Sequence, residues 1–564
     1  MVTWTNRLNR RYREFLKANP IWFVFLIGII IVIGVDRYAK QEPPQDLKQR
    51  IDYFKAVGMP SEAEPIYQHL LAGDQLNLDL HYAFLENHIA IEEAGNRPGD
   101  DRALVNYYTL LTNNQATQDI GVFGLGYVAA AQKDFDKAID LYLQVQNQDQ
   151  KYLNYAIAKA YQGLDEPDLA EKYFLREITV NGYESASVKE LASLFADQNR
   201  VDQMRFLVVN SQTAPYVELA DRRKLAYLNG DIIGYLKLTV LGCYQAIEFT
   251  PSMVAVLICL VWVNYFRRID IFKKEPLWLL LCIFFFGAVT AVFALLLGDL
   301  IKGYYPFTCG ESRWCLMMAS IVRIGLVEEV VKFLPVLVIL FVVRRVSEPF
   351  DLVVYGSFSA LGFATLENMF YFSRYGLEIA FFRFFFSTLM HLSMTSIICY
   401  AWAKALFIYK ENSLIALSRG LLVAATIHGL FDFFVLNPTS GQYALGMAIA
   451  FIMAREYYRM LRNTLNFSPF FNEDLASSCG LKNNQLLLSA GVILLLIAFL
   501  YSNFEFSTEI ARSRTLQIGI FALPTMTAVI GPLGKLGLSR GKFNPLLIKI
   551  KLKEPHPGLA GSSS

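Results

Sequence analysis

Long apolar stretches separated by short polar segments dominate the chain after residue 248. A helix needs about 20 mainly apolar residues to cross the roughly 30 Å of a bilayer's hydrocarbon core. Ten windows meet this need, namely residues 20–35, 250–266, 277–298, 316–343, 352–373, 381–408, 414–436, 440–460, 486–503 and 515–533. The pattern predicts an all-α fold, a polytopic membrane helix bundle of about ten spans.

Residues 36–248 are more polar and show helical periodicity instead. GYVAAAQKDFDKAIDLYLQV is followed by AKAYQGLDEPDLAEKYFLREI, with Ala138 and Ala170 32 positions apart, as are Tyr142 and Phe174. This interval is typical of degenerate tetratricopeptide-like repeats, which place small residues where paired helices touch. We therefore expect a helical-repeat domain that offers a concave face to a peptide or protein partner, with an irregular helical domain as the alternative.

Basic residues between the windows predict the topology. NRLNRRYREFLK precedes the first window, and that window lacks a convincing A-x-A site, so it resembles an uncleaved signal anchor whose basic flank stays in the cytoplasm. Alternation from there puts FRRIDIFKK, VVRRVSE, REYYRMLR and the lysine-rich tail on the same side. We therefore expect a multi-pass protein of the plasma (inner) membrane, with both termini cytoplasmic and the repeat domain extracytoplasmic.

These patterns divide the chain into five regions. They are a basic segment with its signal-anchor helix (1–35), the extracytoplasmic repeat domain (36–248), a membrane domain (249–460), a further two-span segment (461–534) and a basic cytoplasmic tail (535–564).

Composition agrees with a membrane bundle attached to a soluble part. Of the 564 residues, 54% are hydrophobic and 18% are charged, and the net charge of +2 gives no indication of a nucleic-acid partner. The seven cysteines form no CxxC motif. Cys309 and Cys315 share one short loop on the predicted outer face, where a disulfide between them can persist.

Four consecutive windows carry ionisable residues that a lipid-facing helix would not tolerate. They are Arg323, Glu328, Glu329 and Lys332 in residues 316–343, Glu367 in 352–373, His391 in 381–408, and His428 with Asp432 in 414–436. Each charge near the bilayer centre costs roughly 2.5 to 3.5 kcal/mol on insertion scales. At 1.5 Å per residue the main groups lie about 9 to 18 Å from the outer ends of their windows. We therefore expect four helices to converge on one hydrated pocket.

The residue types in this pocket suit the activation of water. Two adjacent glutamates in a low dielectric cannot both ionise comfortably, so one stays anionic and can take a proton from water beside a histidine. A second histidine, oriented by Asp432, can donate to the oxygen that becomes negative when an amide is attacked. The alternative is that these groups are satisfied ion pairs and interhelical hydrogen bonds with no chemistry.

The motifs resemble those of the PrsW family of intramembrane proteases. The matching stretches are EEVVK at 328–332, GFATLENMFY at 362–371, RFFFSTLMH at 383–391 and HGLFD at 428–432, preceded by RRIDIFKKEPLWLL with Asp270, Glu275 and Pro276. The resemblance covers roughly residues 265–460. The chain is also similar to the CAAX-processing and bacteriocin-immunity protease group.

The resemblance implies a polytopic endopeptidase that cuts membrane-anchored, single-pass proteins, and some family members are linked to anti-sigma-factor cleavage. By position it implies a water-activating set of Glu328, Glu329 and His391, and an oxyanion-side set of His428 and Asp432. It leaves open which glutamate is the base. The expected residues for positioning the substrate or the catalytic groups are Lys332, Glu367, Asn368, Tyr371 and Arg383.

Metal dependence is a separate question. No HExxH motif is present and each histidine lies on its own helix, so we favour a metal-free glutamate mechanism without a cofactor. The alternative is zinc held by His391, His428 and Glu329. A catalytically silent scaffold is the competing function, and a transporter ranks last because the sequence shows no inverted repeats.

Overall fold

The structure is a computed structural model that describes residues 44–547 except 57–58, 94–101, 181, 305–311, 344, 437–441, 479–480, 506–507 and 535. Every regular element in this part of the chain is a helix, which confirms the all-α class. The first predicted window, 20–35, lies outside the described residues.

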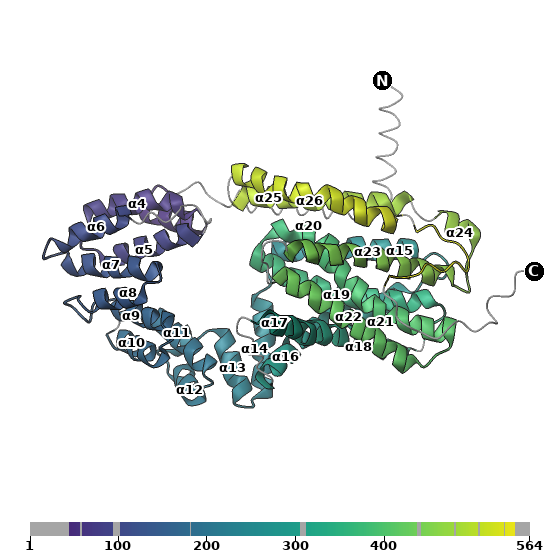
Figure 1. Ribbon diagram of the computed structural model, residues 1–564, viewed down its shortest axis with the longest axis horizontal. Helices are drawn as coiled ribbons and strands as arrows, with labels where there is room; N and C mark the ends of the chain where they lie inside the picture. Colours follow the sequence, from purple (N-terminus) through teal and green to yellow (C-terminus); the bar gives the residue numbers. More distant parts are fainter. Residues whose placement is uncertain are drawn as a thin grey trace, which may run out of the picture. The chain divides into compact units, whose positions relative to one another are not determined.

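Contacts divide the chain into two compact units that meet in sequence between Gly242 and Cys243. The N-terminal unit stacks short helices one after another (Figure 1). They are α3 (Leu47–Ala56), α4 (Pro60–Gly73), α5 (Leu78–Glu93), α6 (Arg102–Thr112), α7 (Gln118–Ala131), α8 (Phe135–Tyr142), α9 (Leu153–Gly163), α10 (Pro167–Thr179), α11 (Glu184–Asp197), α12 (Val201–Val209), the short 3-10 turn η1 (Ala214–Tyr216), α13 (Leu219–Leu228) and α14 (Ile232–Gln245).

The residues that suggested a repeat all lie in the core of this unit. Ala138 and Ala170 are buried, and so are the aromatic rings of Tyr142 and Phe174 one turn later on the same helices. The Tyr142 ring packs against Phe123 of α7 and the Phe174 ring against Tyr155 of α9, in each case on the helix that precedes its own, as in the paired helices of a repeat. The assignment to tetratricopeptide-like repeats stays a prediction.

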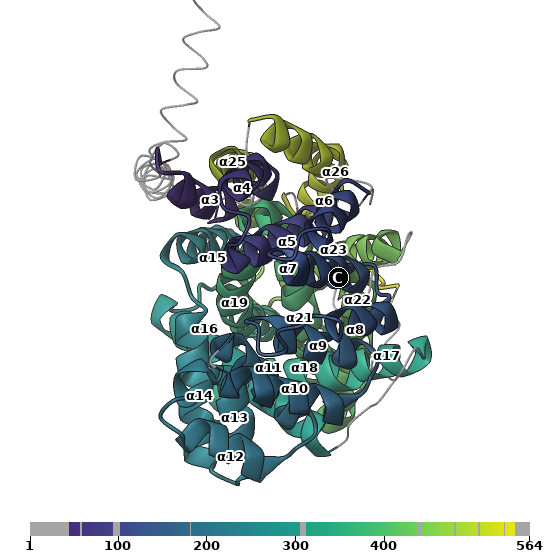
Figure 2. The same ribbon diagram turned by 90° about the vertical axis from the view of Figure 1, so that its left-hand side faces the viewer.

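The second unit contains the membrane helices. They are α15 (Phe249–Ile269), α16 (Leu277–Tyr304), α17 (Arg313–Ala319), η2 (Ser320–Leu326), α18 (Val327–Val342), α19 (Pro349–Tyr375), η3 (Leu377–Ile379), α20 (Ala380–Phe382), η4 (Arg383–Thr388), α21 (Leu389–Ala403), η5 (Lys404–Tyr409), α22 (Ser413–Leu436), α23 (Gln442–Asn466), α24 (Glu473–Ser478), α25 (Leu481–Glu505) and α26 (Thr508–Gly534). We call this part the membrane unit. Helices α25 and α26 lie side by side at its edge (Figures 1 and 2).

Seven helical segments in the described residues are long and apolar enough to cross a membrane, so the chain is a multi-pass membrane protein. They are Phe249–Ile269, Leu277–Gly298, Pro349–Tyr375, Leu377–Tyr409, Ser413–Leu436, Asn483–Ser502 and Leu516–Gly534. The predicted count of about ten is not confirmed. Windows 316–343 and 440–460 are helical but fall outside this set, and both carry several charged residues.

Helices α19 and α21 form the interior of the membrane unit. In each of the spans that contain them, 94% of the most apolar window is buried, against 39–56% for the other five spans. A span buried on all sides by other helices can carry polar groups away from lipid. The interior of the unit is therefore the place where the ionisable residues can be accommodated.

Glycines let the helices around this interior approach closely. A Cβ added to Gly429 of α22 would lie 2.3 Å from the Ile321 Cα of η2, and one added to Gly325 of η2 would lie 2.2 Å from the Ala425 carbonyl oxygen. Small residues at such crossings allow backbones to touch. The crossing brings α22, with His428, beside the start of α18, with Glu328.

Buried acidic groups join the loops at one end of the membrane unit. The Asp270 carboxylate accepts from the Glu275 backbone N–H at 2.8 Å, the Glu275 carboxylate accepts from the Tyr355 hydroxyl at 2.7 Å, and Glu348 accepts from Ser468. Burial raises the pKa of Asp270 to about 6 and that of Glu348 to about 7. The motif that contains Asp270 and Glu275 therefore has a structural role in holding α15, α16 and α19 together.

Candidate active site

Helix α18 brings three ionisable side chains to one place. Glu328 and Lys332 are four residues apart and Glu329 and Lys332 three apart, so all three project from one side of the helix. A π-helical segment, η2, immediately precedes them, and a second, η4, precedes the helix that carries His391. Such segments shift the helical register locally and are frequent at functional sites.

The Lys332 ammonium is the hub of the site. It is fully buried and lies 2.9 Å from Glu328 Oε2, 3.1 Å from Glu329 Oε1 and 2.7 Å from His391 Nδ1, and it stands 4.3 Å over the Phe363 ring. A buried cation is tolerated only when its donors are paired. All three ammonium hydrogens therefore have acceptors within the site.

Glu329 is fully enclosed and fully hydrogen-bonded. Its Oε1 lies 2.8 Å from His428 Nδ1 and also receives the lysine, and its Oε2 accepts from the Thr395 hydroxyl at 2.8 Å. Its side chain has no exposed surface. A carboxylate in this position fixes its neighbours and has no free side for water.

Each histidine has one nitrogen held by a carboxylate. His391 Nε2 lies 2.7 Å from Glu367 Oε2, and His428 Nδ1 lies 2.8 Å from Glu329 Oε1. Because an ionised carboxylate only accepts, we assign the proton of each ring to the nitrogen that faces its carboxylate. The second nitrogens are then the acceptors: His391 Nδ1 accepts from the Lys332 ammonium at 2.7 Å, and His428 Nε2 lies 3.6 Å from Glu328 Oε2.

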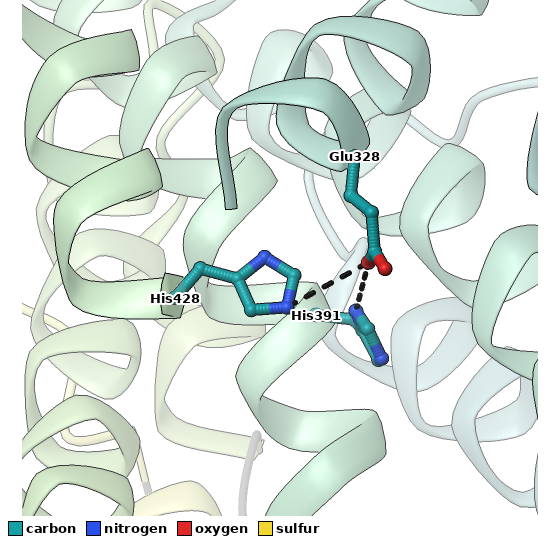
Figure 3. Close-up of side chains that lie close together, drawn as sticks. All are labelled: Glu328, His391 and His428. Atoms are coloured by element: carbon teal, nitrogen blue, oxygen red, sulfur yellow. Dashed lines mark ion pairs between the residues drawn. The ribbon is translucent and has the colours of Figure 1, made fainter. Parts of the chain in front are cut away.

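The Glu328 carboxylate faces both histidine rings (Figure 3). Its Oε2 is 3.6 Å from His428 Nε2 and 4.0 Å from His391 Nδ1, and the three ligand atoms lie within 4.8 Å of one another. The Glu328 side chain keeps 17% of its surface exposed, whereas that of Glu329 keeps none. Glu328 is therefore the member of the pair that a water or a substrate can reach.

Glu367 is anchored from outside the site. The Arg383 guanidinium donates to Glu367 Oε2 at 2.8 Å and to the Asn368 side-chain oxygen at 2.6 Å, and it stacks 4.1 Å from the Tyr371 ring centre. The structure thus joins four of the five predicted positioning residues in one network that ends on His391 Nε2, whereas Lys332 contacts His391 at Nδ1.

Asp432 lies beside His428, as the i, i+4 spacing predicts, but the closer carboxylate on this ring belongs to Glu329. The Asp432 carboxylate lies 3.4 Å from His428 Nε2, the nitrogen that faces Glu328, while Nδ1 is held by Glu329. In the structure Glu329, on another helix, therefore makes the hydrogen bond that orients His428. Sequence spacing favoured Asp432 because residues i and i+4 share a helix face, but it gives no information about contacts between helices.

Some contributors to the site were not foreseen. Thr395 bonds Glu329, and Thr388 accepts from Asn368 at 3.2 Å. Thr395 follows His391 by four residues on the same helix, so a search for polar residues at helical spacing from each histidine would have found it. Only one cysteine of the predicted disulfide is among the described residues. Cys315 is disulfide-bonded, but Cys309 lies outside the described residues.

The donor types at the centre are those of a catalytic metal site. Two imidazole nitrogens and a carboxylate oxygen with an open position suit zinc, and outer carboxylates that fix the histidines are a usual accompaniment. The carboxylate that groups with the histidines is Glu328 rather than the predicted Glu329. However, Lys332 already contacts two of the three donor atoms, Glu328 Oε2 and His391 Nδ1. The donors fit a metal ion in kind, but the lysine and the ion cannot use them together.

Apolar spans around a buried carboxylate and imidazole centre define the class of the protein, a polytopic membrane protein of the intramembrane-protease type. A model described as "PrsW family intramembrane metalloprotease" matches residues 275–454. Over 193 residues the chain is 33% identical to a Protease PrsW of Clostridioides difficile, across 33% of this chain and 79% of that protein. A Protease PrsW of Bacillus subtilis is 29% identical over 170 residues, or 30% of this chain and 75% of the relative.

The chain belongs to the PrsW family, a family of intramembrane proteases. The matched region ends at residue 454 and begins at 275, so it includes the whole site from Glu328 to Asp432. It leaves out the N-terminal unit and the α25–α26 pair.

Proposed function

We propose that the protein is an intramembrane endopeptidase that hydrolyses peptide bonds of membrane-anchored proteins, with Glu328 as the general base. The observation that carries the proposal is the difference between the two adjacent glutamates. Glu329 is enclosed by Lys332, His428 and Thr395, whereas the Glu328 side chain keeps 17% of its surface exposed beside His391 and His428. Family membership supports the reaction class.

The chemistry follows from this arrangement. The Glu328 carboxylate takes a proton from water, and the resulting hydroxide attacks the carbonyl carbon of the scissile amide. His428 Nε2, 3.6 Å from Glu328, can accept that proton and pass it to the leaving nitrogen as the carbon–nitrogen bond breaks. The buried Lys332 ammonium stabilises the negative charge that develops on the carbonyl oxygen.

We propose further that Lys332, rather than a metal ion, is the resident cation of this site. If an ion were bound, Glu328, His391 and His428 would hold it and it would polarise water and the substrate carbonyl. The lysine donates to two of those donor atoms at 2.7 and 2.9 Å. Two cations sharing the same donors repel strongly in a low dielectric. The favoured mechanism is therefore the metal-free, glutamate-dependent one.

The rest of the chain suggests how substrates are chosen. The N-terminal unit is a stack of helices of the kind that binds peptides, so we assign it recognition of a substrate or partner protein. We keep the predicted topology as part of the proposal, with both termini cytoplasmic, residues 36–248 outside and the plasma membrane as the location. A single-pass protein, such as an anti-sigma factor, is the substrate class that the family resemblance implies.

The test is cleavage of a single-pass reporter by the purified protein in liposomes. Glu328→Gln, which keeps the side-chain shape, should reduce cleavage at least 10³-fold, on the order of the loss seen when a catalytic group is removed. Glu473→Gln, at an exposed position on α24, is the matched control and should cut like the parent. If the Glu328, Glu329 and His391 variants all cut the reporter as well as the parent, the proposal fails and the scaffold function is favoured instead. A strong chelator should leave the parent active.

A further inference from the structure

Helix α14 carries an exposed apolar stripe that the proteolytic site does not explain. At 100° per residue, Ile232, Leu236, Val240, Ile233 and Tyr244 fall within an arc of about 120°. Their exposed fractions are 70%, 40%, 59%, 68% and 78%. Single exposed apolar residues are ordinary on protein surfaces, but a continuous stripe of five large ones marks a surface that is covered by something.

The face of α14 that adjoins the stripe on the Ile232 side is already buried by the fold. Tyr235 and Thr239, one turn apart, are buried at 6% and 1%, and the Thr239 hydroxyl donates to the Tyr235 carbonyl oxygen at 2.9 Å. The helix begins at a capped turn, because the Asp231 carboxylate accepts from the Gly234 backbone N–H at 2.8 Å. The helix is therefore formed and oriented without help from its apolar stripe.

Chain continuity identifies what can cover the stripe. Only Ala246–Glu248 separate the end of α14 from Phe249, where the membrane span α15 begins. Three residues reach at most about 11 Å, so the last turn of α14 lies at the boundary of the hydrocarbon core. The surface available at that point is the headgroup layer of the bilayer itself.

The length and composition of α14 decide how it meets this surface. The helix has 14 residues and is about 21 Å long. Its exposed apolar side chains run from the first residue, Ile232, to the last turn, at Tyr244. A helix standing upright would bury only its last turn, so covering the whole stripe requires the axis to lie in the membrane plane.

Charge agrees with a lipid surface. Lys237 is the one charged residue in the segment IIGYLKLTVLGCYQ, and on the helical wheel it lies next to Tyr244, between that ring and the exposed Leu241. A lysine in this position can bury its stem and reach lipid phosphates with its ammonium group. The helix contains no acidic residue, which anionic headgroups would repel.

We infer that α14 is an in-plane membrane anchor that lies in the headgroup layer and joins the N-terminal unit to the first described span. The anchor restricts the N-terminal unit to the membrane surface, where the chain segment flanking a substrate's own span would be found. The anchoring itself is independent of proteolysis. If the protein proved not to be a protease, the contact of α14 with lipid would still stand. If α14 proved not to contact lipid, the proposed protease function would still stand.

The test is spin labelling of the full chain in nanodiscs that contain anionic lipid. With Cys243, Cys282 and Cys479 replaced, nitroxide labels are placed at Ile233→Cys and Val240→Cys on the stripe, and at Phe206→Cys as the control. Phe206 is 65% exposed on α12, so it matches the stripe in exposure but not in position. Power saturation then compares the access of oxygen, which concentrates in lipid, with that of a water-soluble nickel complex.

Both stripe labels should show several-fold greater access to oxygen than to nickel, and the Phe206 label should show the reverse. Nickel access at Val240 and Ile233 equal to that at Phe206 would place the stripe in water and overturn the inference. Exclusion of both reagents would place it against protein, either the membrane unit or a partner, and would also overturn it. The use of two labelled positions on the stripe guards against a single label that disturbs the helix.

Discussion

Replacing Lys332 with methionine tests the assignment of the site's resident cation. The substitution keeps the length of the apolar stem but removes the ammonium, which lies 2.9 Å from Glu328 and 3.1 Å from Glu329. At an effective dielectric constant of 20 each pair corresponds to about 5 kcal/mol of Coulomb attraction. The cost of burying the charges offsets much of this, and losing one partner of such a group costs about 3 to 5 kcal/mol.

Two measurements separate the outcomes. The apparent midpoint of thermal unfolding of Lys332→Met should fall by several degrees, because the enclosed Glu329 and the partly exposed Glu328 lose their cation. The same variant should gain a divalent ion, since Glu328 Oε2 and His391 Nδ1 become free to bind one together with His428. After zinc loading and buffer exchange, elemental analysis should find close to one zinc per chain in the variant and almost none in the parent.

Lys404→Met is the matched control, because Lys404 is also buried but lies against the Tyr400 and Tyr409 rings, away from the site. It should leave metal content unchanged. A parent protein that retains one zinc per chain, and loses cleavage when a chelator removes it, would refute the reasoning about Lys332.

Three further predictions concern the surroundings of the site. Glu367→Gln should lower cleavage about 10- to 100-fold with little change in the midpoint of unfolding, because the fixed orientation of His391 is lost. A loss of cleavage as complete as that of a variant that does not fold would contradict a positioning role. Gly429→Ala should destabilise the protein by about 1 to 3 kcal/mol, measured as a shift in thermal unfolding, whereas Gly531→Ala, with open space around it, should not. Because burial raises the pKa of Glu348 from 4.5 to about 7, its proton stabilises the folded state fully below pH 4.5. This contribution of about 3 kcal/mol is lost as the pH rises through 7. Glu348→Gln should therefore flatten the pH dependence of the midpoint between pH 5 and 8, and an unchanged slope would count against it.

Much of the membrane unit follows from local sequence. Inside a bilayer the backbone groups of a segment must hydrogen-bond within that segment, so a sufficiently long apolar segment forms a membrane-spanning helix. Windows such as 277–298 and 414–436 are accordingly found as spans. The charged window 316–343 shows the limit of this rule. It forms η2 and α18 but not an apolar span, because its ionisable residues are accommodated by other helices rather than by lipid.

The sequence by itself determined the all-helical class, seven of its predicted spans and the types of residue at the centre, including the contact of Glu328 with Lys332, because helical spacing fixes neighbours on the same helix. Only the tertiary structure decided which glutamate is enclosed and which is accessible, and that His428 is held by Glu329 and His391 by Glu367. Those contacts depend on how each helix is rotated about its axis and how closely it crosses its neighbours. Close approaches such as that of Gly429 to Ile321 set these quantities, and spacing along one chain segment does not encode them.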